Sequence, residues 1–154
     1  MSGQQVFKNI VWRIGALSPT SVLASERFRH LDNPTRQGED QSLADRSFQI
    51  YFDSSERVET YSDLAHRWND VTYVMEFGYK AERLQGNFHQ LLLDDRNDLL
   101  KLLRDPANYS GYSDDNSTDD IGLKNRVFDG DELEREGPTW IYRMRWIHKI
   151  EEAE

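Results

Sequence analysis

The most strongly patterned segment of the chain, residues 139–150, alternates between two kinds of side chain at every second position. Alternation over this length predicts a long, half-buried β-strand, because successive side chains of a strand point to opposite faces of its sheet. One face is mostly aromatic and carries Trp140, Tyr142, Met144, Trp146, His148 and Ile150. The other face carries Ile141, Arg143, Arg145, Ile147 and Lys149. The chain must therefore supply a sheet for this strand and a layer that covers its aromatic face.

Two other segments have the periodicity of amphipathic helices, residues 4–17 and 88–104. An acidic run in the middle of the second segment leaves a later start open, with Asp94 or Asp95 as the N-cap. A short helix is also predicted over residues 61–68. The apolar stripes of the two main helices are Val6, Ile10, Ile14 and Leu17, and Leu92, Leu99, Leu102 and Leu103.

Three further strands are predicted, over residues 46–52, 71–79 and 123–128, and the last of them is followed by a turn at Asp129-Gly130-Asp131. Two strand pairs separated by a helix predict an α+β fold. We expect a small antiparallel or mixed sheet of about four strands, with two main helices packed on one face. A length of 154 residues favours a single domain, residues 1–154.

The composition excludes several classes of function. The chain has no cysteine, so it has no disulfide, no thiol nucleophile and no zinc–thiolate site. No apolar run approaches the roughly 18 residues of a membrane span, and the N-terminus does not resemble a signal peptide. We therefore expect a soluble protein, made in the cytoplasm, with no membrane partner. The net charge is -9 and is concentrated in two loop-like blocks, residues 32–45 and 105–136, so a basic nucleic-acid footprint is absent.

Catalytic motifs are also missing from the sequence. It contains no glycine-rich phosphate loop, no nucleophile elbow and no His-Glu-x-x-His pair. We expect no enzyme activity, no metal and no cofactor. The alternative from another class is a metal-dependent nuclease in which Asp94, Asp95 and Asp98 hold a magnesium ion. Carboxylates near a helix start are also stabilised by the helix dipole, without any metal.

Several landmarks follow one another in an order that resembles a known family. The N-terminal helix is followed by residues 27–32, Arg-Phe-Arg-His-Leu-Asp, and by residues 46–52, Arg-Ser-Phe-Gln-Ile-Tyr-Phe. Next come residues 71–79, Val-Thr-Tyr-Val-Met-Glu-Phe-Gly-Tyr, and residues 95–103, Asp-Arg-Asn-Asp-Leu-Leu-Lys-Leu-Leu. The last two landmarks are residues 105–109, Asp-Pro-Ala-Asn-Tyr, and residues 140–146, Trp-Ile-Tyr-Arg-Met-Arg-Trp. This arrangement resembles the tail terminator, or tail-completion, proteins of long-tailed bacteriophages.

The resemblance implies a structural virion protein of the tail or neck. Such a protein forms a ring, expected to be a homohexamer, which caps the tail tube and docks it to the head. The partners would be further copies of the chain, the tail tube protein and a head–tail connector or stopper protein. DNA would be passing cargo and would not be bound specifically, which suits acidic loops. Another neck or head–tail adaptor role remains the alternative within this class.

Two sets of residues are candidates for the interfaces of such an assembly. The cationic row Arg143, Arg145 and Lys149 could bind an acidic partner, or it could be the solvated face of a sheet that pairs with neighbouring acids.

The second candidate is the segment 105–122, which is rich in Asp, Ser, Asn and Gly and has no apolar period. We expect it to be mobile in the free subunit and ordered in the assembly, with its aspartates facing the lumen or a basic partner; the alternative is a permanently disordered surface loop. The interface residues expected in this segment are Tyr109, Tyr112, Asp114, Asp115, Asp119 and Asp120.

Overall fold

The computed structural model describes residues 2–31, 44–57, 66–80 and 87–153. It has two α-helices and a five-stranded sheet with the strand order β1-β2-β3-β5-β4. The pair β1–β2 is parallel and the other three pairs are antiparallel, so the sheet is mixed. The elements are α1 (Ser2–Ala16), β1 (Arg29–His30), β2 (Ser47–Arg57), β3 (His66–Lys80), α2 (Phe88–Arg104), the short 3-10 helices η3 (Pro106–Asn108) and η4 (Asp114–Asn116), β4 (Leu123–Glu136) and β5 (Thr139–Ala153).

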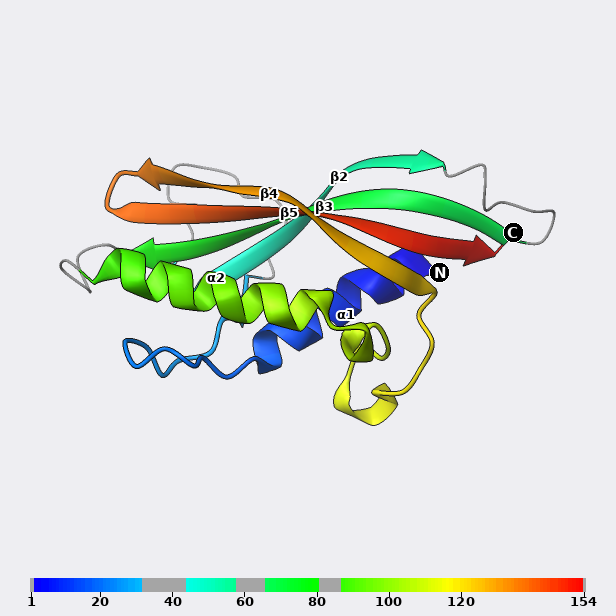
Figure 1. The fold of residues 1–154 in the computed structure, drawn as a ribbon, viewed down its shortest axis with the longest axis horizontal. Helices are drawn as coiled ribbons and strands as arrows, with labels where there is room; N and C mark the ends of the chain where they lie inside the picture. The colour runs from blue at the N-terminus through cyan, green and yellow to red at the C-terminus, as the bar shows by residue number, and fades with distance from the viewer. Residues whose placement is uncertain (1, 32–43, 58–65, 81–86, 154) are drawn as a thin grey trace.

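The two helices cover one face of the sheet. No described helix covers the opposite face, called the open face below, although Val74, Glu76 and Ile141 on it are buried. Figure 1 shows α1 and α2 on the same side of the strands, with the segment between α2 and β4 also on that side. The predicted α+β class and the packing of both main helices on one face are confirmed. Neither described helix has the length and apolar character that crossing a membrane would require.

The alternation predicted for the last strand determines which of its side chains lie in the hydrophobic core. Its aromatic face points at the helices, where Tyr142, Met144, Trp146, His148 and Ile150 are buried and Trp140 is half-buried. β3 supplies a matching row, and α1 and α2 cover both strands with aliphatic side chains. The buried residues are Val71, Tyr73, Met75, Phe77 and Tyr79 on β3, Val6, Ile10 and Ile14 on α1, and Leu91, Leu92, Leu99 and Leu103 on α2.

The predicted turn at Asp129-Gly130-Asp131 is wrong. β4 runs on to Glu136, and its register against β5 shifts between Phe128 and Asp131. Gly130 lies within this register shift and has φ 101°, a backbone conformation that glycine adopts without strain. It therefore permits an irregularity inside the strand and does not end it. The hairpin turns instead at Gly137 and Pro138, and Gly137 has φ 57°.

Two helix predictions also need correction. α2 begins at Phe88, so Asp94 and Asp95 lie within the helix and neither is its N-cap. The short helix predicted over residues 61–68 falls largely outside the described residues, and its last part, 66–68, belongs to strand β3. β3 is therefore longer at its start than alternation over 71–79 predicts.

A first prediction concerns the aromatic face of β5. Trp146 has no exposed surface and packs beside Phe128 with ring centroids 5.2 Å apart. Replacing it with alanine leaves a large cavity, so Trp146→Ala should lower the free energy of unfolding by about 3–5 kcal/mol. Trp12, which is only half-buried on α1, is the matched control, and Trp12→Ala should cost less than half as much. Chemical denaturation of the two variants makes the comparison, and equal losses would contradict the facing of β5.

Candidate functional site

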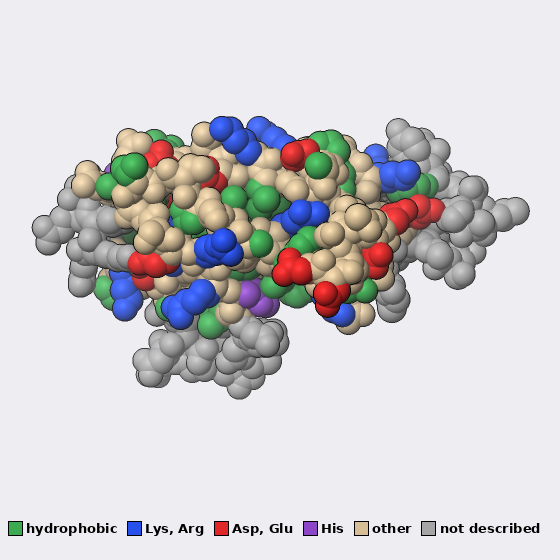
Figure 2. Space-filling view, turned by 90° about the horizontal axis from the view of Figure 1, so that it is seen from below, with side chains coloured by type: hydrophobic (Ala, Val, Ile, Leu, Met, Phe, Trp, Pro, Cys, Tyr) green, Lys and Arg blue, Asp and Glu red, His purple; other side chains and the backbone are tan. Residues whose placement is uncertain are grey.

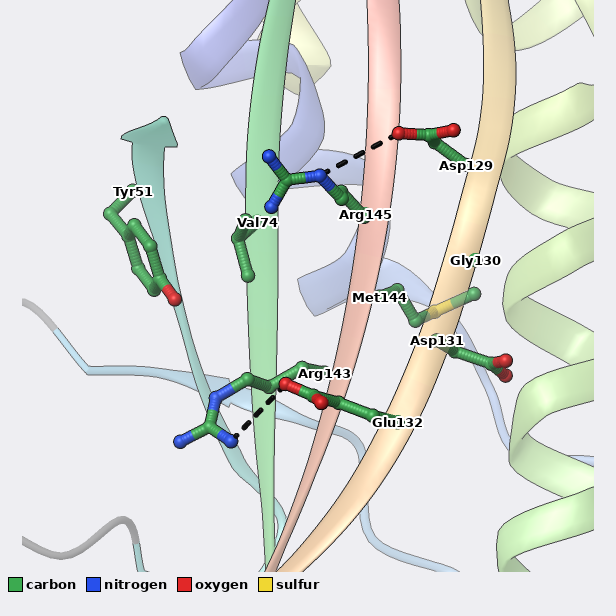
Figure 3. A pocket seen from close by; sticks show the side chains of 9 residues that line it. All are labelled: Tyr51, Val74, Asp129, Gly130, Asp131, Glu132, Arg143, Met144 and Arg145. Atoms are coloured by element: carbon green, nitrogen blue, oxygen red, sulfur yellow. Dashed lines mark ion pairs between the residues drawn. The ribbon is translucent and has the colours of Figure 1, made fainter. Parts of the chain in front are cut away.

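The open face of the sheet has a shallow hollow at its centre. It has a volume of about 340 Å³ and lies over β2, β3, β5 and β4. Figure 3 shows Arg143 and Arg145 of β5 reaching across it from either end, with Val74 of β3 between them and Tyr51 of β2 at the side. Arg143 and Arg145 belong to the face of β5 opposite the aromatic core, whereas Met144, which also lines the hollow, belongs to the core face.

Arg143 is surrounded by carboxylates from two neighbouring strands. Its Nε lies 2.5 Å from Oε2 of Glu76 on β3, and its Nη1 pairs with Glu134 on β4. Glu132 and Glu136 are further partners at 3.6 and 3.9 Å. Partial burial alone would lower the pKa of Arg143, but the hydrogen bonds to Glu134 and Glu76 outweigh it and raise that pKa above its ordinary value.

Arg145 and Lys149 continue this row along β5. Arg145 pairs with Asp53 of β2 and lies 3.6 Å from Asp129 of β4. Lys149 is half-buried, and its Cα is in register with Asp70 of β3. Both arginines of the predicted cationic row are thus already engaged by acids of the same molecule, the arrangement expected of a sheet face that pairs internally.

The open face around these two arginines is acidic, which favours the second alternative for the cationic row, a sheet face that pairs with neighbouring acids. Six carboxylates contact two guanidinium groups, an excess of four negative charges. The alternating sequence of β5 displays its own cations, but it does not show which acids the neighbouring strands bring beside them. The six carboxylates belong to Asp53, Glu76, Asp129, Glu132, Glu134 and Glu136.

The segment 105–122 lies on the other side of the sheet and is packed against α1. The buried side-chain amide of Asn9 donates to the backbone oxygens of Asn108, Ser110 and Gly111, at 3.2, 3.0 and 2.6 Å. Ile121 is buried. A single copy of the chain therefore already makes the contacts that hold this segment, which argues against the expectation that it is mobile in the free subunit.

The aspartates of this segment are exposed on the helix side of the molecule. Asp114 accepts a hydrogen bond of 3.2 Å from the indole nitrogen of Trp12, and Asp120 accepts one from the backbone of Gly122. Asp115 and Asp119 are exposed as well. Figure 2 looks at this side, where acidic and basic side chains are interspersed.

Tyr109 and Tyr112 of the same segment are half-buried and pack against the core, with the ammonium group of Lys8 5.6 Å from the centre of the Tyr112 ring. The predicted interface residues thus form two groups on opposite sides of the sheet, one around Arg143, Arg145 and Lys149 and one in the segment 105–122.

Asp94, Asp95 and Asp98 do not converge on a common point. Asp95 is buried, pairs with Arg46 and accepts a hydrogen bond of 2.8 Å from Tyr79; burial raises its pKa, and Arg46 opposes that shift. Asp98 accepts two hydrogen bonds from Thr20, at 3.0 and 2.7 Å. Asp94 accepts bonds from Ser21 and Gln90. Among the described residues, no group of three or more histidines and acids is placed to hold a metal ion.

One buried polar cluster was not found from the sequence. Arg126 of β4 is 4% exposed, donates from Nη2 to the side-chain oxygen of Asn9, and lies 5.2 Å from the centre of the Tyr109 ring. Burial lowers the pKa of Arg126 to about 10. His148 is fully buried, and its pKa is held well below the ordinary value by burial and by the charge of Arg126. Asn9 joins α1, the segment 105–122 and β4 at this point.

In sequence, the chain matches no protein-family model and no curated protein.

A second prediction tests the role of Asn9. Asn9→Ala removes the donor to three carbonyl groups and the acceptor for Arg126, and it should lower the free energy of unfolding by about 2–4 kcal/mol. It should also make residues 105–122 the site of fast cleavage in limited proteolysis, whereas the unaltered chain resists cleavage there. Asn125→Ala, at an exposed position of β4, is the control. Fast cleavage of the unaltered monomer in this segment would contradict the packing.

A third prediction follows from His148. Its pKa in the folded chain lies below the ordinary value of 6.5, so below pH 6.5 the unfolded chain binds a proton that the folded chain does not. The free energy of unfolding should therefore fall as the pH is lowered from 7 to 5.5, by up to about 1.4 kcal/mol per pH unit from this group. His148→Gln removes the titrating group, and denaturation at several pH values should give a shallower dependence. Parallel profiles for the two chains would refute the assignment.

Proposed function

We propose that this protein is a structural component of a long-tailed bacteriophage virion, a tail terminator that forms a ring on the tail tube and joins it to the head. The observation that supports this most is the one-sided sheet. Both main helices lie on one face, which leaves the ion-paired row around Arg143 and Arg145 and the two edges of a long sheet outside the helical layer. Exposed sheet edges are common sites of contact with other chains, and natural proteins often place charges on them.

The two edges of the sheet differ, which is what a ring requires. A closed ring of identical subunits uses head-to-tail contacts, in which one patch of a subunit binds a different patch of the next. β1 is an edge strand of two residues, whereas β4, at the other edge, has 14 residues. A two-fold dimer would instead need one patch that is complementary to itself.

The charge of the open face suits a channel through which DNA passes. The four excess negative charges around Arg143 and Arg145 repel a phosphate backbone at short range. A ring that gripped DNA would slow its movement, because each neutralised phosphate adds to the affinity. The acidic face therefore agrees with a role in which DNA is cargo only.

The test is electron microscopy of the purified protein mixed with tail tubes of its phage. We expect closed rings on one end of each tube, sixfold by the family resemblance, and tubes that no longer lengthen when more tube protein is added. Tubes without the protein are the control. A single copy on the tube, or an assembly without closed symmetry, would contradict the proposal. Cleavage of DNA by the protein in the presence of magnesium would favour the nuclease instead.

A further inference from the structure

The two edge regions of the sheet carry charges of opposite sign. Along β4, residues 129–136 contain five acids and one arginine. At the β1 edge, Arg27, Arg29 and Lys80 are exposed around a hollow of about 360 Å³. We name these two surfaces the acidic edge (residues 129–136) and the basic edge (Arg27, Arg29 and Lys80). Arg29 and the acidic edge lie on opposite sides of the sheet, because β1 and β4 are the outermost strands, whereas Lys80 is on β3 and shares the β5 partner Thr139 with Glu136.

The acids of the acidic edge are only partly neutralised within the molecule. Arg143 is the ion-pair partner of Glu132, Glu134 and Glu136, and it is also shared with Glu76. One guanidinium group cannot neutralise four carboxylates. The carboxyl side chains of Glu132, Glu134 and Glu136 are 69%, 53% and 44% exposed, so the remaining negative charge faces solvent.

The basic edge has a smaller surplus of the opposite sign. Its hollow is also lined by Glu26, Asp45 and Arg46. Arg46 is directed inward to the buried Asp95, so among the described residues that line the hollow three exposed cations stand beside two acids. Among the described residues, no ion pair involves Arg29 or Lys80.

We infer that the acidic edge of one copy of this chain binds the basic edge of the next copy. Charge selects this head-to-tail pairing, because two acidic edges brought together would repel each other and so would two basic edges. The net charge of -9 opposes any association of copies, so a local pair of opposite edges is the contact that electrostatics favours. This inference rests on the proposed ring and names the surfaces that form it.

The test is a charge swap. Variant A is Asp129→Lys with Glu132→Lys and Glu136→Lys, which gives the acidic edge four bases and two acids and leaves Glu76 and Glu134 to hold Arg143. Variant B is Arg27→Glu with Arg29→Glu. In A both edges are basic and in B both are acidic, so each variant alone should associate at least about tenfold more weakly than the unaltered chain. A mixture of A and B should recover association, because each edge then meets its opposite.

Two control variants carry the same charge changes away from the edges. Asp114→Lys with Asp115→Lys and Asp119→Lys matches variant A, and Lys101→Glu with Arg104→Glu matches variant B; all five residues are exposed and belong to α2 or to the segment between α2 and β4, on the helix side. Sedimentation at about 50 mM salt, where surface charges are weakly screened, measures association, and circular dichroism checks folding. Controls that fail like the variants, or a mixture that does not recover, would overturn the inference.

Disulfide trapping on capped tail tubes separates this inference from the proposed function. The chain has no cysteine, so Arg29→Cys with Glu132→Cys places the only two thiols. Oxidation should give a ladder of cross-linked copies from the double variant, and each single variant should stay monomeric. Tubes capped by rings without the ladder would overturn the edge contact alone. A ladder in solution with no capping would overturn the tail role alone. A chain that stays monomeric in both settings would overturn both.

Discussion

The ladder between β3 and β5 sets the position of the other elements. It runs without a register shift from His66 opposite Ala153 to Lys80 opposite Thr139. The two flanking pairings, β2 with β3 and β4 with β5, both contain shifts. An even register keeps alternate side chains on a constant face, so the aromatic rows of β3 and β5 form one continuous surface for the two helices.

The same ladder organises the charge on the open face. Glu76 of β3 stands opposite Arg143 of β5, and Glu132 of β4 stands opposite Arg143 from the other side. Opposite charges at directly facing positions favour the correct register, whereas a slip of one residue would turn every side chain to the wrong face. Each exposed ion pair stabilises the fold only slightly. The larger effect of these ion pairs is to offset part of the negative charge on β4, so that several glutamates can lie beside β5.

Much of the framework could be predicted because it depends on local patterns. Alternation over residues 139–150 gave the correct buried face, and the stripe of Val6, Ile10 and Ile14 lies in the core as predicted. The turn at Gly130 was misplaced because a glycine with positive φ serves a bulge as well as a turn. Local sequence does not distinguish these two uses of glycine.

The candidate site was harder to predict, since its contacts join distant parts of the chain. Asp95 pairs with Arg46, 49 positions away, and Asn9 holds Gly111 across 102 positions. Nothing near Asn9 in sequence marks it as the residue that orders an acidic segment. Likewise, the acids that surround Arg143 and Arg145 come from β2, β3 and β4, so the sign of the open face depends on strand order and register.

The place of β5 in the sheet has a consequence for how the chain folds. β5 lies between β3 and β4, so β3 has an unpaired side until residues 139–153 are available. The β5 partner of each β3 residue lies at least 59 positions later in the sequence, which is the separation between Lys80 and Thr139. Pairing over such separations slows folding, because a long loop has to close before any contact forms. During synthesis β3 is therefore an apolar strand with one open edge, the kind of segment that chaperones bind and that aggregates when they do not.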